Sequence, residues 1–200
     1  MAKKNLSSKI LIDSYVSIAF VAISLIILLC DLFLSKGKIA AFLASPVLAP
    51  ENNINQFNVT SIKSYFQMIF YVFAPSDVNV LIPNLIFIML LGPTLEDRYG
   101  ITVIGVMIFI CALFSGVLNA CFCKNSLTGP SCIVYMMIFL NIFFSLIKKK
   151  IPLSFVIIFI LLIVKDVLSD SGLITLIINI CGGLCGSLIA FLASPKVRAT

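Results

Sequence analysis

The order of hydrophobic and polar residues divides the chain into six long apolar segments separated by short polar joints. Crossing about 30 Å of hydrocarbon takes roughly 20 helical residues, fewer where a helix starts inside the protein. The apolar runs are continuous and do not alternate, which predicts helices rather than the strands of a barrel. The predicted spans are residues 10–34, 78–91, 101–123, 131–147, 152–168 and 173–193.

The composition strengthens this interpretation. Hydrophobic residues make up 61% of the 200 residues and charged residues 11%, against about 45–50% and 25% in soluble proteins. A soluble domain of this size could not bury so much apolar surface. The net charge of +6 comes mostly from short basic clusters between the apolar runs. We therefore expect the lipid bilayer as a partner, and no nucleic acid.

The basic residues also predict an orientation. Nine lysines and arginines fall on one side of a six-span chain and five on the other, so the positive-inside rule places both termini in the cytoplasm. The abundance of Ile, Lys, Phe and Asn favours a bacterial plasma membrane. The first side carries Lys3, Lys4, Lys9, Arg98, Lys148, Lys149, Lys150, Lys196 and Arg198, and the second carries Lys36, Lys38, Lys63, Lys124 and Lys165.

One transmembrane domain is expected over residues 1–200, with a long outer connection at about 35–73. The second half of this connection, residues 65–73, is aromatic and apolar but bounded by Lys63 and Asp77. Such a segment either lies in the membrane interface or packs on the helices.

Cysteine and histidine usage limits the chemistry. Seven cysteines is an odd number, and all lie in or at the ends of apolar segments, so no disulfide framework is implied. The chain contains no histidine, and no cysteine pair has the partners of a zinc site. We therefore predict no metal and no cofactor.

Polar residues inside a membrane span are costly and need a structural or functional reason. Three groups stand out: Asn84 with the polar stretch 92–100 behind it, residues 129–135, and residues 179–186. Gly182 and Gly186 are four residues apart, hence on one helix face, where a neighbouring helix can approach closely. Gly129 precedes a proline and Ser131, an order that suits a tight turn into a helix start with free backbone N–H groups.

These groups resemble the rhomboid family of intramembrane serine proteases over about residues 65–191. The resemblance implies a six-transmembrane-helix rhomboid-type bundle with Ser131 at the nucleophile position. The family's Gly-x-Ser-Gly matches residues 129–132, its following aromatic matches Tyr135, and its Glu-x-Arg matches Glu96 and Arg98. Its His-x-x-Gly-x-x-x-Gly aligns with Asn179, Gly182 and Gly186, and its oxyanion-binding His-x-x-x-Asn aligns with Val80 and Asn84.

Both histidines of the family pattern are therefore absent, replaced by Asn179 and Val80, and Cys132 replaces the second glycine after the nucleophile position. An amide is not basic enough to accept the serine proton. Loss of the histidine base costs roughly 10⁴–10⁶-fold in turnover, and loss of an oxyanion donor roughly 10²–10³-fold.

Other residues could restore the chemistry. Lys124 or Lys165 would have to act as an uncharged base. We expect Lys124 to be solvated in a loop, and Lys165 to pair with Asp166 or anchor its helix at the interface. Cys132 has no histidine or clear cation beside it to make a thiolate.

The sequence thus predicts a rhomboid-like protein that binds or regulates transmembrane segments of other membrane proteins without cleaving them. The alternative is an active rhomboid-type endopeptidase with Ser131 as nucleophile. A small-molecule transporter is a third reading, which the lack of ionisable groups at mid-membrane disfavours. We expect Ser131 to cap its helix, Gly182 and Gly186 to pack helices, and Glu96 and Arg98 to cap the loop between spans two and three.

Overall fold

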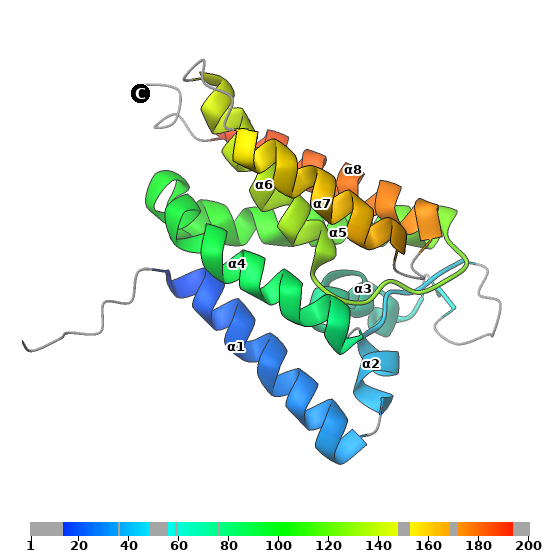
Figure 1. The fold of residues 1–200 in the computed structure, drawn as a ribbon. Coiled ribbons are helices and arrows are strands. Elements are labelled where there is room, and N and C mark those ends of the chain that lie inside the picture. The colour runs from blue at the N-terminus through cyan, green and yellow to red at the C-terminus, as the bar shows by residue number, and fades with distance from the viewer. Residues whose placement is uncertain are drawn as a thin grey trace, which may run out of the picture.

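The computed structural model of the chain is a bundle of helices (Figure 1). In the part of the chain that the structure describes, loops join the helices, and the pairing between Val47 and Gln56 is an isolated bridge rather than a strand. The predicted all-α membrane bundle is confirmed. The structure describes residues 14–35, 37–48, 56–58, 60–75, 77–147, 153–168 and 172–193.

Six long helices build the described part of the bundle. By length and composition, four of them can cross a membrane, namely α1 with the turn after it, α4, α5 and α8. The long helices are α1 (Tyr15–Cys30), continued by a π-helical turn (Asp31–Ser35), α4 (Val78–Tyr99), α5 (Ile101–Phe122), α6 (Ser131–Ile147), α7 (Leu153–Leu168) and α8 (Gly172–Ala193). Two shorter helices lie between α1 and α4 in the chain, α2 (Lys38–Leu43) and α3 (Ile62–Phe70), the latter with a 3₁₀ turn (Tyr71–Phe73).

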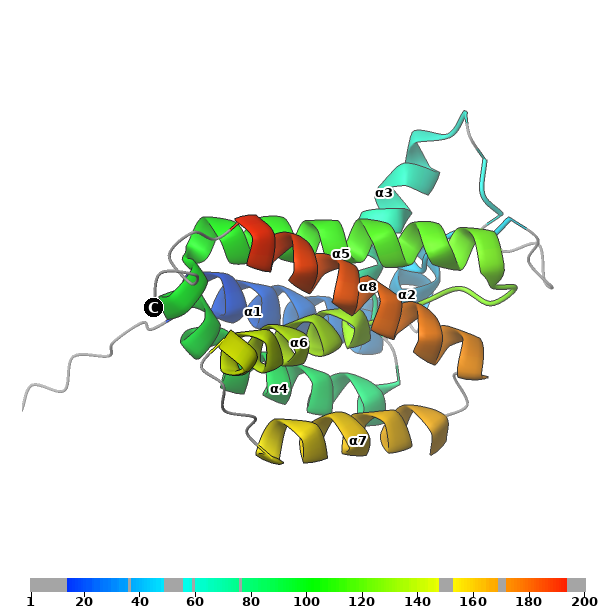
Figure 2. The same ribbon diagram turned by 90° about the horizontal axis from the view of Figure 1, so that it is seen from above.

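α6 is the centre of the bundle. It contacts α4, α5, α7 and α8, which lie around it in Figure 2. Every residue from Cys132 to Asn141 is buried. A helix that is enclosed on all sides has no polar face, which explains the nearly unbroken apolar sequence. Ser131 therefore stands at the start of the most enclosed helix.

A glycine lets α8 approach the backbone of α6. A Cβ atom added to Gly183 would lie 2.8 Å from the Met136 nitrogen and 2.8 Å from the Tyr135 Cβ atom, closer than such atoms can approach. The contact joins the two helices one turn beyond Ser131. The sequence analysis overlooked Gly183, although it lies between the two glycines that it singled out.

The neighbouring glycines of α8 face α5 as well. A Cβ atom on Gly182 would collide with the Ser115 side chain, and one on Gly186 would lie 2.9 Å from the Cys111 Cβ atom. Close approach of this kind is how helices gain packing energy in a membrane, where lipid removes the hydrophobic drive between them. The three glycines place α8 against both α5 and α6.

α4 is longer than predicted. The expected span ended at Leu91, with a loop at 92–100, whereas the helix continues through Pro93 to Tyr99. Within this last part of the helix, the Thr94 hydroxyl donates to the Leu91 carbonyl at 2.8 Å. The helix ends at Gly100, whose φ of +87° favours glycine and whose N–H bonds the Glu96 carbonyl.

Because α4 continues, Glu96 lies in a helix and its carboxylate reaches a different element from the one expected. It accepts hydrogen bonds from the Val16 and Ser17 N–H groups at 3.2 and 2.8 Å and from the Ser17 hydroxyl at 2.6 Å. The first N–H groups of a helix have no partner within it. Glu96 therefore caps α1 rather than the loop between spans two and three.

The long connection is partly built into the bundle. Helix α3 and its 3₁₀ turn bury Met68 and Tyr71, while Tyr65 and Phe66 remain exposed. A Cβ atom on Gly116 of α5 would meet the Met68 backbone. The segment 65–73 thus packs on the helices along one side, and its other side is an exposed aromatic surface.

Several expectations concern residues outside the described ranges. These are the predicted starts of spans one and five, Ile10 and Pro152, and most of the cytoplasmic basic residues, namely Lys3, Lys4, Lys9, Lys148, Lys149, Lys150, Lys196 and Arg198. The orientation of the termini remains a prediction.

Gly183→Ala is expected to destabilise the fold, because the new methyl group would meet the α6 backbone. Overpacking of a tight contact costs about 1–3 kcal/mol. Gly105→Ala is the matched control, since nothing lies within 4 Å of its Cβ position. Thermal unfolding in detergent measures both, and equal midpoints would contradict the close packing of α8 on α6.

Glu96→Ala is expected to loosen α1. The change leaves the buried donors of Ser17 without their acceptor, at about 1–3 kcal/mol for each unsatisfied group. Limited proteolysis and thermal unfolding would show the loss, with Asp97→Ala, an exposed neighbour, as control. If both variants behaved alike, Glu96 would have no role in holding α1.

Candidate functional site

Ser131 is delivered to its position by a turn. Gly129 has a φ of +87°, a conformation that residues with a side chain rarely adopt. Its N–H donates to the Tyr71 carbonyl at 3.1 Å, and the Pro130 carbonyl accepts from the Ile133 N–H at 3.0 Å. α6 begins directly afterwards, so Ser131 occupies its first turn, half-buried.

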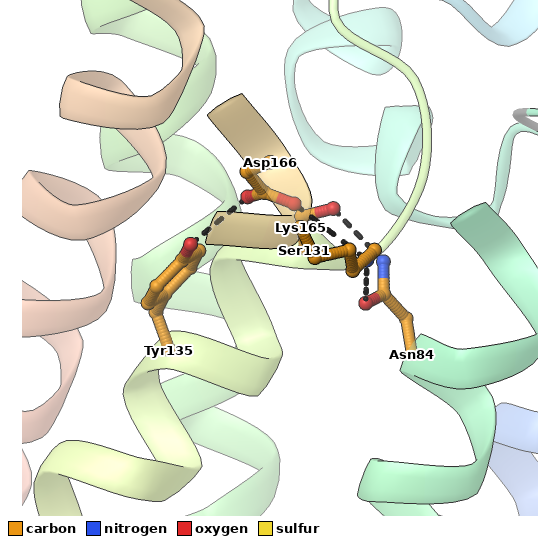
Figure 3. Close-up of polar contacts among 5 residues, drawn as sticks. All are labelled: Asn84, Ser131, Tyr135, Lys165 and Asp166. Carbon is orange, nitrogen blue, oxygen red and sulfur yellow. Dashed lines mark hydrogen bonds and ion pairs between the residues drawn. The ribbon is translucent and has the colours of Figure 1, made fainter. Parts of the chain in front are cut away.

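The hydroxyl of Ser131 accepts a hydrogen bond from α4. Asn84, 1% exposed, donates from its Nδ2 atom to the Ser131 Oγ atom at 2.9 Å. The Asn84 Oδ1 atom in turn accepts from Lys165 Nζ of α7 at 2.8 Å. One amide therefore lies between the serine and the lysine (Figure 3).

The chain of contacts continues on the far side of the lysine. Lys165 Nζ lies 3.6 Å from Asp166 Oδ1, and the Tyr135 hydroxyl donates to Asp166 Oδ2 at 3.0 Å. Tyr135 and Asp166 are buried. Figure 3 shows this set of five side chains joining α4, α6 and α7. Buried charges in a membrane protein are expected to be paired in this way.

The lysine fixes which way the amide points. An ammonium group can only donate hydrogen bonds, so the carbonyl oxygen of Asn84 must face Lys165. The amide nitrogen then faces Ser131 and can only donate. The serine oxygen is consequently an acceptor in this contact, and its proton is not taken by Asn84.

Asn179, which the sequence resemblance aligns with the family's histidine, is buried in α8. Its position follows from the contact of Gly183 with Tyr135 and Met136, because Asn179 precedes Gly183 by four residues, as Ser131 precedes Tyr135. Asn179 is therefore level with Ser131. Among the described residues, the hydrogen-bond donor to Ser131 is Asn84 and not Asn179.

Val80 lies one turn before Asn84 in α4 and is half-buried. Residues four apart share a helix face, so Val80 faces the same side of α4 as Asn84. It offers an apolar side chain where the family places a hydrogen-bond donor. Among the described residues at these two positions, Asn84 is the one with a hydrogen-bond donor in its side chain.

Cys132 lies behind Ser131 and is fully buried. Its Sγ atom is 3.2 Å from the Tyr71 hydroxyl, and its carbonyl accepts from the Cys111 thiol at 3.4 Å. The family's glycine has no side chain at this position. Here the thiol of α6 contacts the Tyr71 hydroxyl of the 3₁₀ turn.

Arg98 is remote from Ser131. It lies in the last turn of α4, where Nη1 is 3.4 Å from Asn141 Oδ1 and the guanidinium lies over the Phe144 ring at 4.2 Å. Both partners belong to α6. Arg98 thus joins α4 to α6, rather than capping a loop.

Of the two lysines considered from the sequence, the structure brings Lys165 into the site. Lys124 is exposed in the loop before α6. The adjacent Lys165–Asp166 ion pair was expected, but the contact with Asn84 was not. A signal for this contact was available in the sequence. Spans four and five run antiparallel, so a charged pair at the end of span five returns to the level of Ser131 at the start of span four.

Comparison with known proteins identifies the family of the chain. The family model for the Rhomboid domain matches residues 63–199. The chain belongs to the Rhomboid family. None of the curated proteins matches it. The matched region contains every residue of the rhomboid-like site described above.

The polar set is expected to hold α7 in this rhomboid bundle. Lys165→Met would remove the cation beside Asp166 Oδ1 and the described donor to the Asn84 oxygen, at a cost of about 1–3 kcal/mol. Tyr135→Phe removes a single hydrogen bond, worth about 0.5–1.5 kcal/mol. Thermal unfolding should rank the losses in that order.

The double variant Lys165→Met/Asp166→Asn is the control, because it removes the uncompensated charge while its amide oxygen can still accept from Tyr135. It should be more stable than Lys165→Met alone. A Lys165→Met protein that unfolds at the midpoint of the unaltered protein would show that the contacts carry no stability.

Proposed function

We propose that this rhomboid protein binds transmembrane segments of other membrane proteins and does not cleave them. The observation that supports the proposal is the contact of Ser131 with Asn84 rather than with a base. Serine attack on a peptide bond needs a group that accepts the hydroxyl proton and later returns it to the leaving amine. An amide does neither.

The lysine in the site also favours a silent protein. Lys165 donates to Asn84 and lies beside the Asp166 carboxylate, so its described partners are an amide oxygen and a carboxylate, and not the Ser131 hydroxyl. The nearest candidate base is thus engaged by two other groups.

The scaffold around the site supports binding. The glycine contacts of α8 and the buried centre of α6 hold the helices together through packing, which does not depend on a catalytic group. Exposed apolar side chains lie on α3 and at the Lys165 end of α7, including Tyr65, Phe66, Val167 and Leu168. We propose these surfaces, with the end of α4 nearest Asn84, as the place where a partner segment enters.

The second candidate function is an active intramembrane serine endopeptidase. One observation favours it, since a single amide separates Lys165 from Ser131. Pairs of serine and lysine can act as nucleophile and base when the amine is uncharged. This candidate requires that Asn84 move aside when a substrate binds.

A cleavage assay in proteoliposomes tests the proposal. The unaltered protein and Ser131→Ala are expected to leave a transmembrane test substrate intact to the same extent, because the serine has no base. Co-isolation of that substrate should equally be unaffected by Ser131→Ala and should exceed capture of a scrambled transmembrane helix.

The variant Asn179→His/Val80→His serves as the positive arm, because it returns both imidazoles of the family pattern to the level of Ser131. Cleavage by this variant would show an intact scaffold. Cleavage by the unaltered protein that disappears in Ser131→Ala would contradict the proposal and favour the endopeptidase.

A further inference from the structure

We propose that Asn84 acts as an insulator, a side chain that keeps Lys165 from becoming the base of Ser131. The inference rests on the proposed function, that the unaltered protein is silent, and assigns the silence to one residue. It gives Asn84 a role different from oxyanion binding. Removing its side chain would create an active serine–lysine pair.

The first support is the position of the amide. Asn84 donates to Ser131 Oγ at 2.9 Å and accepts from Lys165 Nζ at 2.8 Å. The serine and the lysine therefore approach the same small planar group from two helices, α6 and α7, as Figure 3 shows. Asn84 itself is 1% exposed, so the amide that both groups contact is buried and water does not replace it freely.

The second support is what the two groups would do without the amide. In Asn84→Ala, Ser131 loses its described donor and Lys165 loses its nearest described acceptor. A polar group that loses its partner in an apolar surrounding costs about 1–3 kcal/mol, and Lys165 keeps the Asp166 carboxylate at 3.6 Å but no described hydrogen-bond acceptor. Each group can satisfy the other, because a lysine side chain is long and flexible. The truncation therefore drives Nζ toward Oγ.

The third support is that the rest of the site needs no rearrangement. Ser131 is held by the turn at Gly129 and by the start of α6. Asp166 keeps its bond from Tyr135, so the end of α7 stays in place. The lysine side chain alone has to move.

The reaction of this pair can be observed with a fluorophosphonate. The Ser131 oxygen forms a bond to phosphorus, the P–F bond breaks and fluoride leaves. The serine proton passes to the neutral amine of Lys165, which becomes an ammonium. The product is a stable phosphonate ester on Ser131, which a fluorescent tag on the reagent reports.

The experiment labels the purified full chain in proteoliposomes with this reagent. Asn84→Ala should react about 10²-fold faster than the unaltered protein, the range of a general base. Its labelling should rise with pH, because only the uncharged amine accepts a proton. Labelling should vanish in Asn84→Ala/Ser131→Ala and in Asn84→Ala/Lys165→Met.

Two matched variants isolate the spacing. Asn84→Leu keeps roughly the volume of the amide and should stay unreactive, because the leucine still separates the two groups. Asn79→Ala makes the same change at an exposed position of α4 and should also stay unreactive. Asn84→Ser, which also leaves space, replaces Asn84→Ala if thermal unfolding shows that the alanine variant does not fold.

The outcomes separate the two proposals. A folded Asn84→Ala or Asn84→Ser protein that remains unlabelled would overturn the insulator and leave the silent protein standing. Labelling that survives Lys165→Met would overturn it as well. Labelling of Ser131 in the unaltered protein at the rate of Asn84→Ala would instead contradict the proposed function.

Discussion

Lys165 lies among apolar helices with a side chain that is 25% exposed, where an unpaired charge is costly, and its need for partners organises the site. Lys165 meets it through the Asn84 oxygen and the Asp166 carboxylate. Once the ammonium faces the oxygen, the amide nitrogen has to face Ser131. The state of the serine is therefore set by a charge on a different helix, and a single interaction couples α4, α6 and α7.

The remainder of the bundle lets this interaction exist. α6 carries Ser131 and is buried from Cys132 to Asn141, so the serine end of the helix has little freedom. α8 approaches α6 at Gly183, where a side chain would not fit. Glu96 of α4 caps α1. The contacts of the site join α4, α6 and α7, so α1 supports the bundle without contributing a side chain to these contacts. Scaffold packing and site chemistry are thus carried by different residues.

Much of the fold could be predicted from the sequence because hydrophobic length is a direct physical signal. The spans that became α5, α6, α7 and α8 ended within a residue of their predicted limits. α4 exceeded its prediction because Pro93 and charged residues are typical of a loop, whereas the helix continues to Tyr99 and its Glu96 carboxylate binds α1. The hydropathy of residues around Glu96 does not indicate that its partner, Ser17, lies in α1.

The same limit applies to the site. Ser131 and Asn84 could be predicted because a family pattern fixes their spacing, and the loss of both histidines could be read directly from the composition. The contact of Lys165 with Asn84 could not, since the two residues are 81 positions apart and no motif links them. Its prediction requires the register of α7 against α4.

The central claim is that the Asn84 amide separates Ser131 from Lys165. An experimental structure of the protein in a lipid bilayer, at a resolution that shows these three side chains, tests it most directly. The account predicts that the Asn84 amide nitrogen donates a hydrogen bond to the Ser131 oxygen and that the Lys165 amine donates one to the Asn84 amide oxygen. A direct hydrogen bond from Lys165 to Ser131, with Asn84 turned away, would contradict it.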